Sequence, residues 1–155
     1  LAAVGVHEGQ LLAGGLVQQG MDLVTQGQLA GDLRRGNGRG LSHNGFLPWK
    51  KIKNSIEYLL ENYTEKGTSI SHAASISNLS EVHFRRVFKE ILSIPPIKYL
   101  NMLRIEKAKE LLKNTSISVS DIVDAVGYSN VNYFCKRFKK ETGLTPSQYR
   151  KNNFQ

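Results

Sequence analysis

The sequence predicts an all-α fold in which two helix-turn-helix lobes are joined by one long linker helix, behind a glycine-rich N-terminal segment. Three observations support this prediction. Apolar residues recur at helical spacing through most of residues 46–155. Serine, asparagine, glycine and proline stand where these helices would begin or end. Finally, the second half of this region repeats the pattern of the first half about 50 residues later.

Charge and cysteine content narrow the possible classes of function. The chain has 155 residues and a formal net charge of +8; the three arginines of residues 1–45 are balanced by three acidic residues. A basic excess confined to residues 46–155 favours a polyanionic partner, with nucleic acid ahead of an anionic membrane. The single cysteine, Cys135, excludes an internal disulfide framework and a multi-cysteine zinc site. A reducing cytoplasm is the simplest compartment for such a chain, and no apolar run is long enough to span a membrane.

Residues 1–45 form a separate segment by composition. They hold 11 of the 14 glycines, no lysine and no aromatic residue. Glycines this frequent interrupt helices, so we expect a disordered or loosely ordered segment, or a remnant of another unit. The glycine patterns of phosphate-binding loops are missing, which argues against phosphate binding here. A chain that starts at Leu1 rather than methionine also suggests a fragment or a processed end.

The folded region is expected to begin near Phe46 or Pro48 with an amphipathic helix from Lys50 to about Tyr63. Counted from Ile52, its apolar side chains fall at i, i+4, i+7, i+8 and i+11, which places them in one stripe. We expect this stripe to pack on the rest of the first lobe.

A short helix and a turn follow. Ser69 or Ser71 can cap a helix that ends at Ile76. Asn78 then marks a turn, because asparagine tolerates the left-handed backbone conformation better than other non-glycine residues.

The next helix begins after Ser80 and runs to about Leu92. Phe84, Val87 and Phe88 lie on its buried face at i, i+3 and i+4. The side chains expected on the opposite, exposed face are Val82, Arg85, Arg86 and Lys89.

The linker helix comes next. Pro95 and Pro96 precede it, and its leucines and alanine recur at helical spacing over about Ile97 to Lys113. An Asn-Thr-Ser sequence ends this helix, and a short helix over residues 119–126 leads into the second lobe.

The second lobe contains a tight turn and a basic helix. Gly127 supplies the permissive backbone for the turn, and Ser129 or Asn130 can cap the helix that begins near Asn130. Phe134 and Phe138 lie on the buried face of this helix. The side chains expected on the opposite face are Asn132, Cys135, Lys136 and Lys139, with Tyr133 on the flank.

Gly143, Thr145 and Pro146 are typical of a helix end followed by the cap and first residue of another helix. The matched positions of the repeat are Phe88 with Phe138, Lys89 with Lys139, Pro96 with Pro146 and Tyr99 with Tyr149, each 50 residues apart, and Asn78 with Gly127, 49 apart. A linker of roughly 17 residues is about 25 Å long at 1.5 Å per residue, so it can hold two basic helices side by side. Such helices can enter successive major-groove segments on one face of DNA.

One further set of residues carries a family resemblance. It comprises Leu103–Leu112, Ile122, Val126–Ser129, Tyr133, Phe134, Phe138–Pro146, Tyr149 and Arg150. Through these residues, positions 50–152 resemble the DNA-binding domain of AraC/XylS-type bacterial transcription regulators. The resemblance implies seven helices in two lobes, each with a recognition helix, the helix that enters the major groove.

Carried over by position, the resemblance implies contacts between bases and six side chains. These are Val82, Arg85 and Arg86 in the first lobe and Asn132, Tyr133 and Lys136 in the second. Lys89, Lys139 and Lys140 are expected to contact phosphate or solvent rather than bases. The resemblance further implies transcription activation ahead of repression, double-stranded DNA and RNA polymerase as partners, no cofactor, and a place at the bacterial nucleoid in the cytoplasm. It leaves the effector open.

The sequence departs from the family pattern at several positions. Lys136 stands where arginine is usual, and an ammonium cannot make the planar two-pronged contact to guanine that a guanidinium makes. Ser93 and Asn78 replace glycines, so the first lobe is expected to be the more strained. Val123 stands where alanine is usual.

Other classes of function fit the sequence less well than DNA binding. A cationic amphipathic protein that binds a membrane surface or a protein partner would also carry basic helices, but it does not explain the repeat. His72 and His83 have no partner at metal-ligand spacing, so no metal site is expected. Cys135 has no cysteine-histidine constellation around it, so catalysis is not expected.

Overall fold

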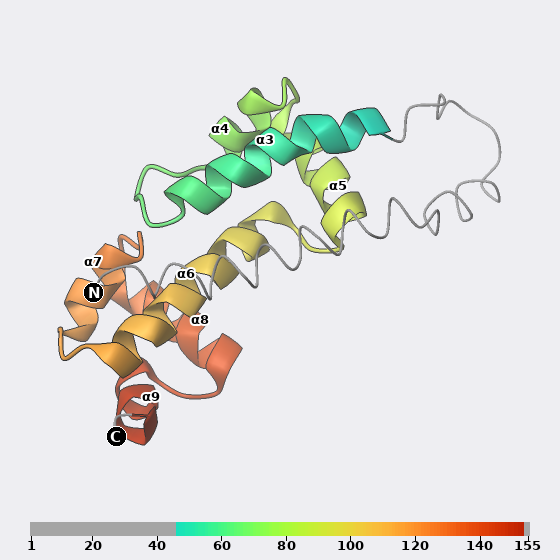
Figure 1. Ribbon diagram of the computed structural model, residues 1–155. Helices are drawn as coiled ribbons and strands as arrows, with labels where there is room; N and C mark the ends of the chain where they lie inside the picture. Colours follow the sequence, from blue (N-terminus) through green and yellow to red (C-terminus); the bar gives the residue numbers. More distant parts are fainter. Residues whose placement is uncertain (1–45, 154–155) are drawn as a thin grey trace.

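The computed structural model describes residues 46–153, and every regular element in this range is an α-helix. Figure 1 shows these helices in two groups, with α6 running through both. The bounds are Phe46–Asn62 for α3, Ile70–Ile76 for α4, Glu81–Leu92 for α5, Pro96–Asn114 for α6, Val119–Ala125 for α7, Val131–Thr142 for α8 and Pro146–Asn153 for α9. The all-α prediction with two lobes and a linker helix is therefore confirmed. The expectations for residues 1–45 lie outside the described residues.

Two predicted helix starts are corrected by the structure. α3 begins at Phe46, ahead of the predicted start at Lys50, and Pro48 falls in its first turn. A proline is tolerated there because the first N–H groups of a helix have no intrahelical partner. For the same reason α6 begins at Pro96 and not at Ile97.

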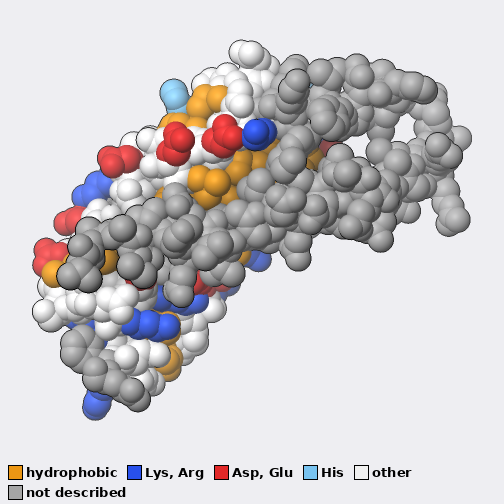
Figure 2. Space-filling model, in the orientation of Figure 1, with side chains coloured by type: hydrophobic (Ala, Val, Ile, Leu, Met, Phe, Trp, Pro, Cys, Tyr) orange, Lys and Arg blue, Asp and Glu red, His pale blue; other side chains and the backbone are white. Residues whose placement is uncertain are grey.

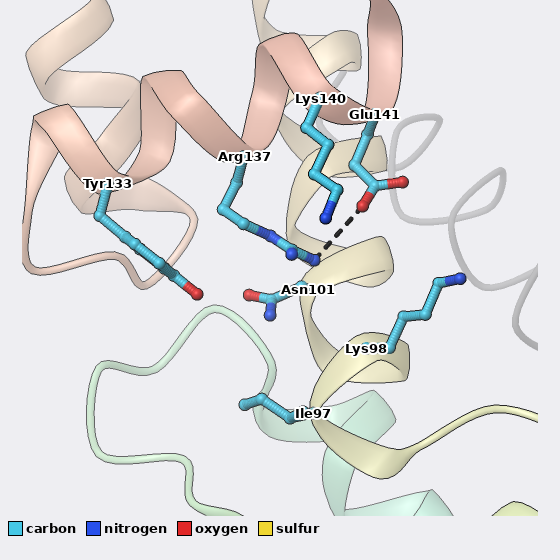
Figure 3. A pocket seen from close by; sticks show the side chains of 7 residues that line it. All are labelled: Ile97, Lys98, Asn101, Tyr133, Arg137, Lys140 and Glu141. Atoms are coloured by element: carbon cyan, nitrogen blue, oxygen red, sulfur yellow. Dashed lines mark hydrogen bonds and ion pairs between the residues drawn. The ribbon is translucent and has the colours of Figure 1, made fainter.

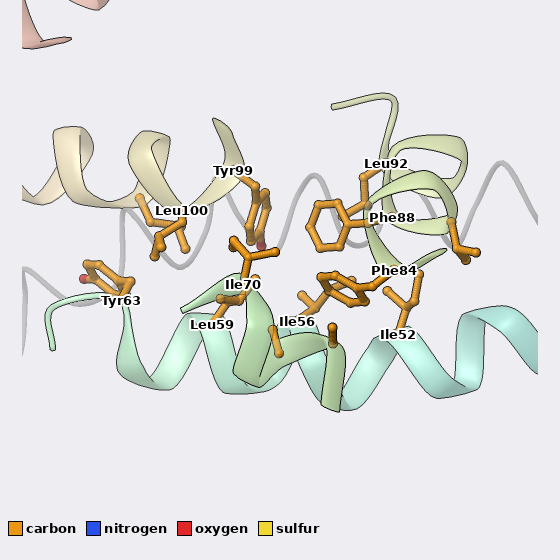
Figure 4. Close-up of a cluster of buried hydrophobic side chains, with 14 residues drawn as sticks. Ile52, Ile56, Leu59, Tyr63, Ile70, Phe84, Phe88, Leu92, Tyr99 and Leu100 are labelled. Carbon is orange, nitrogen blue, oxygen red and sulfur yellow. The ribbon is translucent and has the colours of Figure 1, made fainter. Parts of the chain in front are cut away.

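The first lobe packs α3, α4 and α5 against the start of α6 (Figure 4). Its fully buried side chains include Ile52, Ile56 and Leu59 from α3, Ala73 from α4, Phe84 and Phe88 from α5, and Tyr99 from α6. Burial of large apolar side chains is the main driving force for such packing, at about 1.5 to 3 kcal/mol for each one. The apolar stripe predicted for the first helix therefore forms one side of this core.

The caps of the first lobe follow the sequence prediction and resolve one alternative. Ser69, rather than Ser71, caps α4, because its hydroxyl oxygen accepts a hydrogen bond of 3.1 Å from the backbone N–H of His72. Ser80 caps α5 in the same way. Asn78 has a φ of 53°, in the left-handed region that the turn was predicted to need.

The second lobe packs α7, α8 and α9 against the rest of α6. Its fully buried side chains are Ile105, Ala108 and Leu112 from α6, Ile122 and Val123 from α7, Val126 from the turn, and Phe134 and Phe138 from α8. Asn130 caps α8 through a 2.8 Å hydrogen bond from the backbone N–H of Tyr133. Thr145 and Gln148 cap α9 reciprocally, each side chain accepting from the backbone N–H of the other.

The sequence repeat is also a repeat of contacts. The ring centroids of Phe88 and Tyr99 lie 5.6 Å apart in the first lobe, and those of their counterparts Phe138 and Tyr149 lie 5.4 Å apart in the second. Both pairs are edge-to-face, a favourable arrangement for aromatic rings. In each lobe, therefore, an aromatic residue on the recognition helix packs against one on the helix that follows it.

The two lobes are joined by polar contacts as well as by α6, and Arg104 lies at the centre of these contacts. Its Nε donates to the backbone carbonyl of Tyr63 at 2.7 Å and its Nη2 to that of Glu65 at 3.0 Å. The guanidinium carbon lies 5.4 Å from the centroid of the Tyr128 ring, and the Tyr128 hydroxyl donates to Asn101 at 2.8 Å. Burial lowers the pKa of Arg104 and raises that of Tyr128 to about 12. Because this network ties the end of α3 to α6 and to the second lobe, it fixes the lobes relative to each other.

Candidate nucleic-acid interface

The first recognition helix, α5, presents one apolar and one polar face. Phe84, Val87 and Phe88 are buried in the first core, which fixes the rotation of the helix. The four side chains predicted to contact DNA are all exposed on the other face: Val82, Arg85, Arg86 and Lys89. Val82 is 81% exposed, the largest exposure among the large apolar residues of positions 52–153. An apolar side chain held this far from any core is suited to contact the methyl group of thymine.

Both arginines of α5 are held by glutamates of the same helix. Arg85 donates through Nε at 2.9 Å and through Nη2 at 2.5 Å to the Glu81 carboxylate. Arg86 Nε lies 4.0 Å from the Glu90 carboxylate. Exposed pairs of this kind contribute about 0 to 1 kcal/mol each, so either guanidinium can exchange its glutamate for a base or a phosphate at small cost.

The second recognition helix, α8, presents the corresponding face. Its predicted DNA-contacting residues are all exposed: Asn132, Tyr133, Lys136, Lys139 and Lys140. Tyr133 is 51% exposed, and its ring lies 6.0 Å from that of the buried Tyr128, which supports it from below. None of the three lysines forms an ion pair with any residue between positions 46 and 153. Their ammonium groups are therefore available to an external anion.

Cys135 does not lie where the sequence predicted it. We expected it on the face of α8 opposite the core, beside Asn132 and Lys136, but it is half-buried and packs against the second core. The reason is angular. Cys135 precedes Phe138 by three residues, which places it only about 60° from that side chain around the helix. It is thus a small apolar residue at the border of the core.

A pocket of about 350 Å³ adjoins the second recognition helix, and the sequence prediction did not include it. Its lining residues are Ile97, Lys98 and Asn101 from α6 and Tyr133, Arg137, Lys140 and Glu141 from α8. Figure 3 shows the side chains of α8 extending toward α6 across this space. Arg137 could have been inferred from its position four residues after Tyr133, on the same side of the helix. Lys98 carries no comparable signal, because only the packing of α6 against α8 brings it here.

Acidic side chains gather elsewhere on the molecule. Figure 2 shows a row of them along α3, whose exposed positions include Glu57 and Glu61, four residues apart. Such a row repels a phosphate backbone, so this part of the α3 surface is unsuited to face DNA. By formal charge, α8 stands apart with four basic residues and one acidic residue, whereas α3 and α5 each hold three basic and two acidic residues.

The described residues contain no group of histidine, cysteine or acidic side chains that could hold a metal ion. Across residues 46–153 there is also no helix both long and apolar enough to cross a membrane. His72 is exposed and its ring packs against Tyr58, at 4.9 Å between centroids.

Comparison with known proteins points to one family. A family model described as a helix-turn-helix domain matches residues 73–152, which is more than half of the chain. A curated relative from Bacillus subtilis, the bifunctional transcriptional activator/DNA repair enzyme AdaA, is 39% identical over 94 residues. This match covers 61% of the present chain and 44% of the relative, so the chain spans less than half of that protein.

Solved structures agree with the family model. The C-terminal domain of AraT, a response regulator from Geobacillus stearothermophilus, is 31% identical with a TM-score of 0.64, and the match covers 68% of this chain and 87% of that one. A transcriptional regulator from Chromobacterium violaceum, described by its AraC-type DNA-binding domain, is 26% identical with a TM-score of 0.58; that match covers 68% and 94%. The relatives found are mostly transcription regulators, and the segment shared with AdaA includes the helix-turn-helix domain. Through residues 73–152, with two exposed recognition helices on a shared linker, the chain belongs to the AraC-type family of DNA-binding transcription regulators.

Proposed function

We propose that this protein reads a bipartite site on double-stranded DNA, with α5 in one major-groove segment and α8 in the next. The observation that carries the proposal is the common construction of the two helices. Each is capped, each buries two phenylalanines, and each exposes the side chains predicted to meet DNA. A protein that used one helix alone would have no need to maintain this construction twice.

The linker and the contacts between the lobes support simultaneous binding. α6 contributes buried residues to both cores, so a rotation of either lobe about α6 would break the packing of that lobe on the shared helix. Arg104 adds hydrogen bonds to two carbonyls beyond the end of α3. Major-groove segments on one face of DNA recur about every 34 Å, and ordinary helix-turn-helix proteins reach two of them as dimers. Here one chain would supply both helices.

We infer a division of labour between the lobes. The guanidinium groups of Arg85 and Arg86 have the planar fork that matches the O6 and N7 atoms of guanine. Lys136, at the equivalent reading position of the second lobe, is a point charge that suits phosphate better. The first lobe would therefore supply more of the base-specific contacts, while Asn132 and Tyr133 add readout in the second. Lys89, Lys139 and Lys140 would neutralise phosphates.

The biological role is inferred from the family and from the names of relatives. We propose a transcription activator that works with RNA polymerase at the nucleoid, in the cytoplasm of a bacterium. No enzymatic activity is proposed, because the domain shared with the relatives is a helix-turn-helix domain. The chain shares less than half of the length of the AdaA relative, so an effector-binding function is left open.

Binding to an anionic membrane is the alternative from another class, and the comparisons do not support it. A salt titration separates the two. The chain is titrated with genomic DNA fragments and with anionic lipid vesicles from about 50 to 200 mM salt, a range over which six to ten phosphate contacts lose about 10³-fold or more in affinity. Preference for particular fragments supports the proposal. Equal affinity for all duplexes, with tighter binding to vesicles, contradicts it.

Arg86→Ala tests the base-reading role directly. If Arg86 contacts a base, the substitution weakens binding to the preferred duplex by about 1 to 3 kcal/mol and leaves binding to random duplex almost unchanged. Fluorescence anisotropy with both duplexes measures the two losses. Lys53→Ala is the matched control, because Lys53 also pairs with a glutamate four residues later but lies on α3, outside the two recognition helices. An equal loss on both duplexes would show that Arg86 contacts phosphate instead.

A further inference from the structure

The pocket between α6 and α8 continues the proposed DNA surface toward the first lobe. Tyr133 and Lys140, two of its lining residues, belong to the side chains predicted to contact DNA. Ile97 and Lys98 lie in the first turn of α6, a few residues after the end of α5. The pocket therefore lies on the side of the second recognition helix that faces the start of α6 and the end of α5.

The charge of the pocket suits an anion. Lys98, Arg137 and Lys140 contribute three positive charges and Glu141 one negative charge, which leaves a formal charge of +2. Lys98 and Lys140 are exposed and form no ion pair within residues 46–153. Only Arg137 is neutralised, by Glu141 at 3.3 Å, a long distance for a charge-assisted hydrogen bond.

Arg137 is not fully satisfied by this pairing. Its side chain is 21% exposed, and its Nε atom is buried without a hydrogen-bond partner among the described residues. A guanidinium presents five N–H donors in a fixed plane, and a phosphate can accept from two of them at once. Glu141, whose side chain is 30% exposed, can turn into solvent when a phosphate takes its place.

The start of α6 adds a second source of positive potential. Its N-cap is Pro95, which makes no side-chain capping bond, and Pro96 at the first helical position has no N–H. The N–H groups of Ile97 and Lys98 come next, and the first N–H groups of a helix have no partner within it. A helix of 19 residues carries partial positive charge at this end, which favours phosphate groups. Because Ile97 and Lys98 line the pocket, this end of α6 forms one of its walls.

We propose that the pocket binds a backbone phosphate of the DNA segment that crosses between the two major-groove sites. Lys98, Arg137 and Lys140 surround the phosphate, and Arg137 exchanges Glu141 for it. The inference rests on the proposed function and adds Lys98 and Arg137 to the DNA-binding surface. The bound phosphate would fix the register of the two recognition helices, because it holds the backbone at a point between them.

The first experiment compares charge-removing variants on chemically defined DNA. The chain selects a preferred duplex from a random pool, and anisotropy is then measured on this duplex and on a random duplex of equal length. In a series of duplexes, each phosphate between the two contacted segments is replaced in turn by a neutral methylphosphonate. One replacement is expected to weaken binding of the unsubstituted protein about threefold to tenfold and to lower the salt slope by roughly 0.9, the value for one phosphate contact.

Lys98→Gln is expected to weaken binding to the normal duplex by the same factor. The Lys98→Gln variant should bind the affected methylphosphonate duplex as tightly as the normal duplex, because the variant has already lost the contact between residue 98 and that phosphate. Lys53→Gln, which removes an exposed lysine from α3, should respond to the replacement as the unsubstituted protein does. The proposal is overturned if, at every phosphate position, the methylphosphonate replacement weakens DNA binding equally for the Lys98→Gln variant and for the unsubstituted protein.

Glu141→Gln provides a test that loss of folding cannot imitate. It removes the carboxylate that competes for Arg137, so we expect DNA affinity to rise about threefold, on the scale of an exposed ion pair. The rise should occur on selected and random duplexes alike, since a phosphate contact does not depend on sequence. If the Glu141→Gln variant has the same melting temperature as the unsubstituted protein but an unchanged or lower DNA affinity, the proposed phosphate site in the pocket is contradicted.

Two further outcomes separate the pocket from the proposed function. If the protein binds selected and random duplexes equally, the proposal that it recognises a specific DNA sequence is wrong. The response of the Lys98→Gln variant to the methylphosphonate duplexes still shows whether the pocket binds a backbone phosphate. If millimolar inorganic phosphate raises the melting temperature through Lys98 and Arg137 while no methylphosphonate weakens DNA binding, the pocket holds a free anion. That result overturns the assignment to the DNA backbone.

Discussion

The two lobes place matched residues in the same backbone conformation with different amino acids. Ser93 ends α5 with a φ of 60° and Gly143 ends α8 with a φ of 78°. Each donates its N–H at 2.8 Å to the carbonyl of the lysine four residues earlier. Asn78 and Gly127, the matched residues of the turns, have φ values of 53° and 84°. The fold therefore imposes these left-handed positions in both lobes, whether or not glycine is present.

Gly127 and Gly143 of the second lobe are favoured at their positions for different structural reasons. A Cβ atom added at Gly143 would meet nothing within 4 Å, so only its φ favours glycine. A Cβ atom at Gly127 would lie 2.7 Å from the backbone oxygen of Thr64, which follows α3 of the first lobe. At Gly127, the close approach of the two lobes adds a steric requirement to the conformational one. The exposed Asn78 shows that the turn by itself tolerates asparagine.

The lobes also differ in how their charges are held. The arginines of α5 pair with Glu81 and Glu90, whereas the exposed lysines of α8 have no such partners within residues 46–153. A paired guanidinium is pre-oriented, and an unpaired ammonium is mobile. This contrast agrees with base reading in the first lobe and phosphate binding in the second.

Gly127→Ala is expected to produce the largest effect. The left-handed φ and the contact with the Thr64 backbone together should lower the free energy of unfolding by about 2 to 4 kcal/mol. Chemical denaturation followed by circular dichroism measures this change. Because the contact lies between the lobes, the variant should also lose affinity for a bipartite duplex at a temperature where it remains folded.

The DNA measurement tests whether Gly127 matters through the lobes. A variant that is destabilised but binds the bipartite duplex normally would show that the turn absorbs the added methyl group locally. In that case the relative position of the lobes does not depend on Gly127, and Arg104 with α6 is sufficient to set it.

Much of the fold could be predicted from local sequence. The spacing of Phe84 and Phe88, and of Phe134 and Phe138, is enough to identify the buried faces of both recognition helices. Capping by Ser80 follows equally local rules, because the bonded N–H lies three residues away. These predictions succeeded because each depends on neighbours within about one helical turn.

Features that depend on distant residues could not be predicted in this way. Arg104 is only 8% exposed, and its carbonyl partners at Tyr63 and Glu65 lie 41 and 39 residues earlier in the chain. A charged residue in a helical pattern is normally assigned to solvent, so nothing local marked it as buried. The same reason applies to the pocket, since Lys98 and Arg137 line one pocket only when α6 packs on α8.

Gly143→Ala is expected to have a smaller effect than Gly127→Ala. Only the left-handed φ opposes the methyl group, so the free energy of unfolding should fall by about 1 kcal/mol. Denaturation under the same conditions gives the difference between the two variants, which isolates the steric contribution of Thr64. Equal losses in the two variants would mean that the contact between the lobes adds nothing at Gly127.

Ser93→Gly should have a smaller effect than Gly127→Ala or Gly143→Ala, in the opposite direction. Glycine relieves the left-handed strain but makes the unfolded chain more flexible, so a net gain of about 0.5 kcal/mol is expected. Asn78→Gly is the matched control and should change stability less, because asparagine already tolerates this conformation. If Ser93→Gly stabilises the protein without changing its affinity for DNA, the strain in the first lobe has no part in DNA binding. If affinity falls while stability rises, the left-handed backbone at the end of α5 holds this arginine-bearing helix in the orientation that DNA binding requires. The backbone strain of the first lobe then contributes to base recognition.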